Sequence, residues 1–126
     1  MARHNELGKT GESAAVEFLQ KNGHEILAQN YRFGKAEIDI ISKEGDMLVF
    51  TEVKLRSTDN FGFPEEFVNK KKRKLIQSAA GEYLAENKYD GEIRFDILAI
   101  SNLIDGLKIY HIKDAFFNEG GDEAYQ

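Results

Sequence analysis

Residues 36–57, AEIDIISKEGDMLVFTEVKLRS, contain two runs of strand-forming residues separated by a turn sequence. β-Branched and aromatic side chains favour strands, and KEGD between the runs is typical of a tight hairpin turn. Both runs carry charges inside their apolar pattern: Glu37 and Asp39 in the first, Glu52 and Lys54 in the second. Because side chains alternate between the two faces of a strand, each charged pair shares one face.

The hairpin turn predicts how the two strands pair. With a two-residue turn at positions 44–45, Asp39 is expected opposite Phe50 and Glu37 opposite Glu52. Directly opposite residues share a face, so all the charged side chains would project from one side, with Asp39 and Glu52 as diagonal neighbours. A slip of one residue would place these two acids on opposite faces.

Carboxylates gathered beside one lysine repel one another and resist burial unless a cation joins them. Oxygen ligands of this kind suit Mg²⁺ or Mn²⁺. The pattern therefore predicts a divalent-metal site that activates water and stabilises a phosphoryl transition state, with Lys54 orienting the water or holding charge. The alternative is a solvent-facing ladder of charges on an edge strand. Matching acids on two adjacent strands favours the metal site.

The rest of the chain predicts one α/β domain. Apolar residues at helical spacing predict helices over residues 6–22 and about 65–86, and alternating patterns predict strands over residues 25–31, 92–101 and 106–113. With the hairpin, the order is helix, three strands, helix, two strands. This order predicts a mixed five-stranded sheet flanked by helices.

Composition sets the class of protein. The chain has 126 residues, 41% hydrophobic and 31% charged, which is typical of one soluble globular domain. We expect the domain to cover residues 1–118 and a flexible acidic tail to cover 119–126. Without cysteine there are no disulfides or thiolate sites, and the three histidines show no zinc spacing. With neither a membrane-length apolar run nor a signal-peptide core, we expect a cytoplasmic protein.

The charge distribution predicts local rather than general binding of polyanions. A net charge of −5 argues against a protein that grips nucleic acid over its whole surface, yet residues 70–74 are five consecutive cations. Lys72 falls on the apolar stripe of the second helix, so it must extend to solvent or meet an anion. A phosphate or the acidic cluster is the expected partner.

Two further acids have open roles. Glu12 is either a solvated helix acid or, since it lies beside the apolar stripe of the first helix, a residue near the sheet. Asp96 is either part of a site or a structural partner of Arg94. The nearby GKT at residues 8–10 is not a P-loop, because the glycine required five positions before Gly8 is absent.

The segments EID and FTEVK resemble the divided acidic motif of the PD-(D/E)XK nuclease superfamily. The whole chain resembles the bacterial YraN-like family, which is similar to archaeal Holliday-junction resolvases. The resemblance covers nearly all of residues 5–117 through NELGKTGESAA, NYRFGKAEIDII, VFTEVKLRS, FGFPEEFVNKKK, RFDI and HIKDAF. It implies a restriction-endonuclease-like fold and a Mg²⁺- or Mn²⁺-dependent endonuclease that hydrolyses phosphodiester bonds of DNA, including branched DNA.

The resemblance also implies roles for individual residues. The expected metal site consists of Asp39, Glu52 and Val53, with Lys54 as the motif lysine and Glu12 as a helix-borne catalytic acid. The residues expected to hold nucleic acid are Lys72, Arg56, Lys71 and Arg73. Resolving branched DNA takes two coordinated cuts, so one site per chain implies a homodimer. The alternative function is a non-catalytic nucleic-acid-binding module on a nuclease scaffold.

Overall fold

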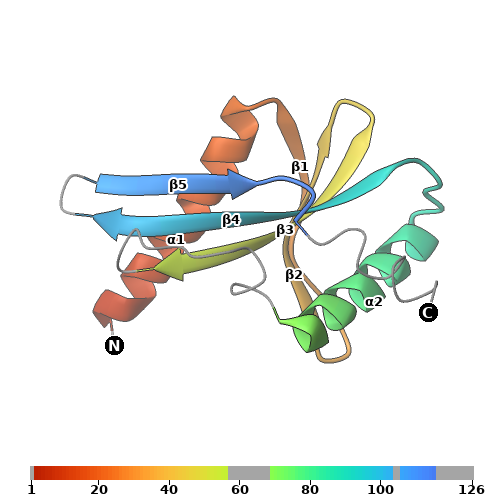
Figure 1. Cartoon of the computed structure of the whole chain (residues 1–126), viewed down its shortest axis with the longest axis horizontal. Helices are drawn as coiled ribbons and strands as arrows, with labels where there is room; N and C mark the ends of the chain where they lie inside the picture. The colour runs from red at the N-terminus through yellow and green to blue at the C-terminus, as the bar shows by residue number, and fades with distance from the viewer. Residues whose placement is uncertain (1, 57–68, 104–105, 116–126) are drawn as a thin grey trace.

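The computed structural model describes the backbone of residues 2–56, 69–103 and 106–115, and the side chains within 11–56, 69–101 and 106–115. The expected tail and the domain boundary at residue 118 lie outside these residues. The order of elements agrees with the sequence-based prediction (Figure 1). The elements are α1 (Ala2–Lys21), β1 (His24–Phe33), β2 (Ala36–Glu44), β3 (Met47–Arg56), α2 (Lys70–Glu86), β4 (Ile93–Leu103) and β5 (Gly106–Ile112).

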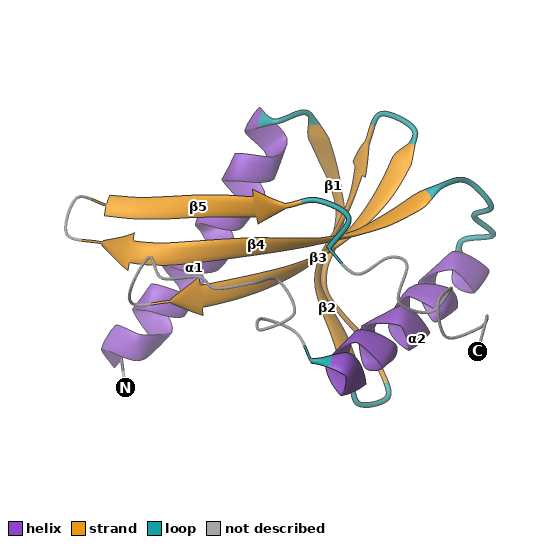
Figure 2. Ribbon diagram, in the orientation of Figure 1, coloured by secondary structure: helices purple, strands orange, loops and turns teal. Residues whose placement is uncertain are grey.

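The five strands form one mixed sheet in the order β1-β2-β3-β4-β5. β3 and β4 are parallel, and the other neighbouring pairs are antiparallel. A parallel pair needs a long crossover connection, and α2 lies in the chain between these two strands (Figure 2). The mixed five-stranded sheet with two helices is thus confirmed, and the crossover brings α2 over the β2–β3 hairpin that carries the charged motif.

Two apolar cores lie on opposite faces of this sheet. Along β4, Phe95, Ile97 and Ala99 belong to the core that includes α2, whereas Leu98 and Ile100 belong to the core that includes α1. This alternation follows from the period of two in a strand. The α2 core also contains Phe50 of β3, while Val53 packs toward the α1 core, so each face of β3 has its own helix.

The second helix begins later than the pattern predicts. It starts at Lys70 rather than near residue 65, because Asn69 has an extended backbone and its side chain accepts a hydrogen bond from the Lys72 N–H. Asparagine is a preferred N-cap because this bond satisfies a donor that the first turn leaves unpaired. The cap places the run of cations in the first turns of α2.

The predicted hairpin register is wrong by two residues. Glu44 pairs with Met47 and Ile41 pairs with Phe50, so the turn consists of Gly45 and Asp46 rather than residues 44 and 45. Gly45 has a φ of 61°, in the left-handed region that tight hairpin turns use and glycine adopts without strain. A shift of two residues preserves the face on which every side chain lies, so the shared-face prediction survives the wrong register.

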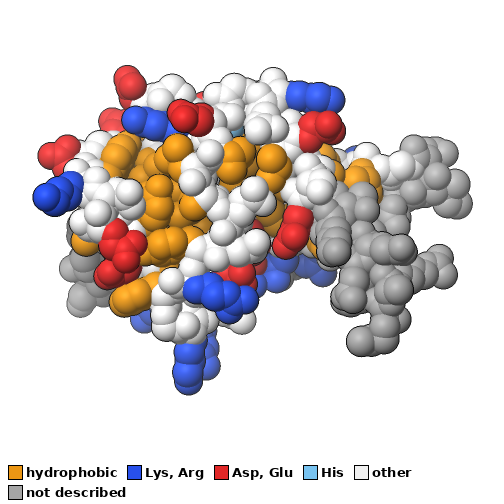
Figure 3. Space-filling model, turned by 180° about the vertical axis from the view of Figure 1, so that it is seen from behind, with side chains coloured by type: hydrophobic (Ala, Val, Ile, Leu, Met, Phe, Trp, Pro, Cys, Tyr) orange, Lys and Arg blue, Asp and Glu red, His pale blue; other side chains and the backbone are white. Residues whose placement is uncertain are grey.

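The surface carries some exposed apolar side chains among the charged ones. Among the described residues, the large exposed ones are Leu27, Phe33, Leu55, Leu107 and Tyr110. Figure 3 shows hydrophobic side chains gathered across the middle of the face seen from behind, with charged side chains around them. In the described part of the chain, neither helix has the length and apolar character needed to cross a bilayer.

Candidate active site

Three acids of the hairpin line one hollow beneath α2. Glu37 and Asp39 come from β2, Glu52 comes from β3 and Lys72 comes from the first turn of α2. The hollow has a volume of about 190 Å³, and Leu75 and Ile76 of α2 form part of its wall. The sheet supplies the acids and the helix supplies a cation, because the β3–α2–β4 crossover places α2 over this face.

Asp39 is a partly buried acid beside a second acid, Glu52. Its Oδ2 accepts a hydrogen bond of 2.8 Å from the main-chain N–H of Val53, which ties β2 to β3 next to Glu52. Burial, and next the negative charge of Glu52, raise the pKa of Asp39 to about 7, although the hydrogen bond from the Val53 N–H acts to lower it. Asp39 therefore binds a proton near neutral pH in the absence of a cation, because two carboxylates at one place cannot both ionise cheaply.

Glu52 is paired with Lys72. The Glu52 side chain is only 5% exposed, and its Oε2 lies 2.6 Å from the Nζ of Lys72. Burial acts to lower the pKa of Lys72, but the hydrogen bond and charge of Glu52 outweigh it, so the pKa is raised. This ion pair confirms that Lys72, on the apolar stripe of its helix, meets an anion rather than only solvent.

Lys54 lies at the same site as a second cation. Burial lowers the pKa of Lys54, and the positive charge of Lys72 lowers it further, against the opposing effect of Glu52. Lys54 and Glu52 lie two residues apart on β3 and so share its face. The motif lysine is thus held beside the acids and has a reduced proton affinity, which suits a group that exchanges hydrogen bonds with water or phosphate.

The donor set fits a hard divalent cation. Mg²⁺ is bound in proteins through one or two carboxylates and keeps several waters, and Asp39 and Glu52 supply two carboxylates. The pKa of Asp39 is raised partly by the negative charge of Glu52, so a cation bound between the two acids would relieve their repulsion. Within the described ranges, no three His, Cys, Asp or Glu side chains are grouped to hold a metal. Val53 packs its side chain toward the α1 core, so only its main chain can face such an ion.

The other predicted nucleic-acid residues differ in their surroundings. Lys71 is exposed on α2, while Arg73 and Arg56 are partly buried and both make interactions within the protein. Arg56 ends β3, and its charge contributes to the lowered pKa of Lys54. Lys35 also lines the hollow and was missed by sequence reasoning. The one local feature that could have indicated it is its position after Gly34 in the β1–β2 turn, two residues before Glu37.

Glu12 does not line the same hollow. It is exposed on α1, the helix that packs on the other face of the sheet, and it lines a separate hollow with Gln29 of β1. Its near neighbour Gly11 faces Leu55 of β3, since an added Cβ would meet that side chain at 2.5 Å. The structure therefore brings together the acids of the hairpin and leaves Glu12 apart. A catalytic role for Glu12 stays a prediction.

A second cluster of charges lies on the α1 side of β4. Asp96 is fully buried and accepts two hydrogen bonds of 2.8 Å from Arg94, one of 3.0 Å from the Asp114 N–H, and contacts His111 Nε2 at 2.8 Å. Burial acts to raise the pKa of Asp96, but these partners lower it overall. Asp96 therefore pairs with Arg94, as its structural role predicts.

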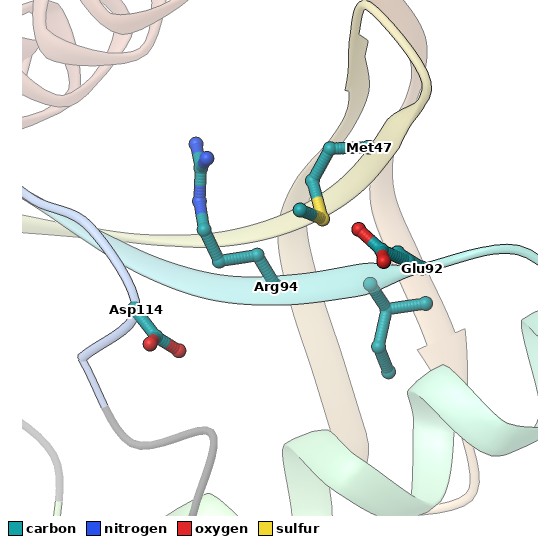
Figure 4. Close-up of a pocket in the computed structure, with 5 residues that line it drawn as sticks. Met47, Glu92, Arg94 and Asp114 are labelled. Carbon is teal, nitrogen blue, oxygen red and sulfur yellow. The ribbon is translucent and has the colours of Figure 1, made fainter.

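Arg94 pairs with a second acid in this cluster as well as with Asp96. Its guanidinium also donates a hydrogen bond of 2.9 Å to Glu44 at the end of β2. Arg94 also lines a hollow of about 370 Å³ together with Met47 of β3 and Asp114 after β5. Figure 4 shows the side chains that line it. Arg94 thus already pairs with two carboxylates, so its positive charge is largely balanced within the protein.

The cluster also brings together two histidines that are distant in the sequence. The rings of His24 and His111 are 6.2 Å apart, and His24 Nδ1 lies 2.8 Å from the hydroxyl of Ser42. Burial lowers the pKa of His24 below its ordinary 6.5, and the charges of His111 and Arg94 lower it further against the attraction of Glu44 and Asp96. His24 is therefore buried in its neutral form.

This burial predicts a loss of stability in mild acid. The unfolded chain binds a proton at His24 near pH 6.5, whereas the folded protein resists it, so the contribution of His24 to the free energy of unfolding should fall as the pH drops through and below about 6.5. His24→Gln should flatten this dependence between about pH 7 and 5.5, as measured by urea unfolding. An unchanged slope in the variant would show that His24 does not cause it.

Known proteins similar to this chain share one family. The profile of "Uncharacterised protein family UPF0102" matches residues 11–100. A UPF0102 protein of Christiangramia forsetii is 52% identical over 117 residues, covering 93% of this chain and 98% of the relative. A UPF0102 protein of Flavobacterium psychrophilum is 50% identical over 118 residues, covering 94% and 99%, and one of Thermodesulfovibrio yellowstonii is 43% identical over 112 residues, covering 89% and 96%. The chain belongs to the UPF0102 family.

Proposed function

We propose that this protein is a metal-dependent endonuclease that acts on DNA, in the manner of the Holliday-junction resolvases that its sequence resembles. One observation carries the proposal: Asp39, Glu52 and Lys72 line the same hollow. Lys54 lies near them, since the charges of Lys72 and Glu52 both change its pKa. Two acids that can hold a divalent ion, with two lysines beside them, suit phosphodiester hydrolysis, because the ion and the lysines can stabilise the negative charge that develops on the phosphate.

Each residue has a distinct task in this proposal. Asp39 and Glu52 would hold Mg²⁺ or Mn²⁺, and the ion would supply Lewis-acid stabilisation of the phosphoryl group and an activated water. Lys54 would orient the attacking water or stabilise charge on the phosphate. The Val53 N–H holds one oxygen of Asp39 and so fixes the direction of its carboxylate. Lys71 and the neighbouring cations of α2 would contact the DNA backbone, which binds lysine and arginine without regard to sequence.

A paired binding and cleavage experiment tests the proposal. Mg²⁺ and Mn²⁺ are titrated into the protein by calorimetry, and labelled duplex, flap, single-stranded and four-way DNA are incubated with the protein and Mn²⁺. We expect ion binding at millimolar or lower concentration and cleavage of at least one substrate. Ion binding without cleavage would favour the non-catalytic nucleic-acid-binding module. No ion binding would remove the metal site.

The affinity for the divalent ion should depend on pH. The pKa of Asp39 is raised to about 7, so the ion must displace a proton below that pH. The dissociation constant should fall about tenfold for each pH unit between about 5.5 and 7 and level off above, because one proton is released in this range. Calorimetry in two buffers with different ionisation enthalpies measures the proton count. An affinity that is constant over this range would contradict the assignment of Asp39 as a ligand.

A further inference from the structure

Lys72 has a fixed main chain and a movable side chain at this site. Its N–H donates a hydrogen bond of 2.8 Å to Asn69 Oδ1, which anchors the residue in the first turn of α2. Its side chain is 41% exposed, while its Nζ reaches 2.6 Å from the nearly buried carboxylate of Glu52. The ammonium can therefore leave Glu52 for solvent by side-chain rotation, without any change in the helix.

The surrounding charges make Lys72 a substitute for a metal ion. It is attracted by Glu52 and by Asp39, the two acids that would hold a divalent ion. It also repels Lys54, whose pKa is lowered partly by the Lys72 charge. Adding a divalent cation to the same carboxylates would place a third positive group among these lysines. The ion would repel the Lys72 ammonium most strongly, because both would occupy the same carboxylate, that of Glu52.

We propose that Lys72 is an exchangeable cation: it occupies Glu52 in the metal-free protein, leaves when a divalent ion binds, and then contacts a DNA phosphate. This inference rests on the proposed function, since it assumes the metal site at Asp39 and Glu52. It goes further because it makes the binding of the divalent ion and the binding of DNA depend on each other. If the ion frees Lys72 for DNA, then DNA that holds Lys72 must in turn favour the ion, by the same factor.

The first test measures ion affinity without DNA. Lys72→Met removes the resident cation, Lys21→Met removes an exposed charge from α1 on the other face of the sheet, and Lys54→Met removes the other lysine of the site. At about pH 8.5, where Asp39 is ionised, Lys72→Met should bind Mn²⁺ about tenfold more tightly than the wild type. Lys21→Met should match the wild type, and the ion affinity of Lys54→Met should rise clearly less than that of Lys72→Met.

The outcomes separate this inference from the proposed function. The exchange would be overturned if the wild type binds the ion but Lys72→Met binds it no more tightly, or if Lys54→Met gains as much affinity as Lys72→Met. Either result would leave the metal site in place. No ion binding in the wild type or in Lys72→Met would overturn the metal site itself, and the exchange with it. Melting curves of all variants would verify that each one is folded.

The second test measures DNA binding at several salt concentrations, with and without Ca²⁺ as the divalent ion. With Ca²⁺, Lys72→Met should lower the salt-dependence slope on duplex DNA by about 0.9, the value for one lost phosphate contact. Without Ca²⁺ the variant and the wild type should have equal slopes, because Lys72 is then held by Glu52. The same slope difference in both conditions would show that Lys72 contacts DNA regardless of the ion and would overturn the exchange.

A third measurement needs no substitution. In the wild-type protein, the ¹⁵N-detected ammonium signal of Lys72 should be visible while its protons are held by Glu52, since the ion pair slows their exchange with water. Addition of Mg²⁺ should broaden or remove that signal. A Lys72 ammonium signal that persists unchanged at saturating Mg²⁺ would overturn the exchange even if the Lys72→Met variant failed to fold.

Discussion

Asp39→Asn is expected to lower DNA cleavage by at least about a hundredfold and to abolish Mg²⁺ binding, while raising the melting temperature at about pH 8. The amide has nearly the shape of the acid and can still accept the Val53 N–H, so the link between β2 and β3 remains. It carries no charge, so it cannot serve as a strong ligand for Mg²⁺ and no longer repels Glu52. Loss of function and gain of stability would thus come from the same change.

The sign of the stability effect follows from the pKa of Asp39. The folded protein binds this proton up to about pH 7, and the unfolded chain only up to about 3.8, so the contribution of Asp39 to stability falls as the pH rises between these values, opposite in sign to the contribution of His24. Asp39→Asn should therefore have little effect near pH 4 and its full stabilising effect above about pH 7. For a domain of this size, each kcal/mol raises the melting temperature by about 3–6 °C.

Asp46→Asn provides the matched control, because it removes the same charge from an exposed position in the β2–β3 turn. It should change neither ion binding nor the pH dependence of melting. Glu52→Gln should also abolish ion binding, but without a gain in stability, since Lys72 would lose its buried partner. Wild-type cleavage in Asp39→Asn or Glu52→Gln would remove the proposed metal site.

Asp96→Ala should cause the largest loss of stability, about 3–5 kcal/mol, as is typical when one partner of a buried charge pair is removed. The substitution leaves the partly buried Arg94, the Asp114 N–H and His111 without the oxygens that they contact. It also leaves a cavity in the α1 side of β4. Asp96→Asn, which keeps the volume and some of the hydrogen bonds, should cost less.

Urea unfolding measures this effect, with Glu92→Ala as the control, because Glu92 is exposed just before the same strand begins. The control should change the free energy of unfolding by less than about 0.5 kcal/mol. A loss of under about 1 kcal/mol in Asp96→Ala would mean that water replaces the carboxylate, and that the cluster contributes little to the stability of the sheet.

Local patterns determined the elements of this protein and the shared face of its acids. Glu37, Asp39 and Glu52 alternate with apolar residues, and alternation depends only on the period of two in a strand. The predicted register was wrong by two residues, yet the acids still line one hollow, because a shift of two returns every side chain to its original face. The beginning of α2 was placed less well, since its N-cap is a single side chain, Asn69.

Tertiary structure alone decided how far each of those acids is exposed: Glu52 is buried, whereas Glu37 and Asp39 are partly buried. The same alternation would suit an exposed ladder, and what excludes solvent is α2, which the crossover between β3 and β4 brings over the hairpin. Packing also paired Lys72 with Glu52 and gathered His24, Asp96 and His111 from distant parts of the chain, while Glu12 was left on the other helix. Periodicity reports which face a residue occupies. What covers that face depends on contacts between residues far apart in sequence, which no local pattern contains.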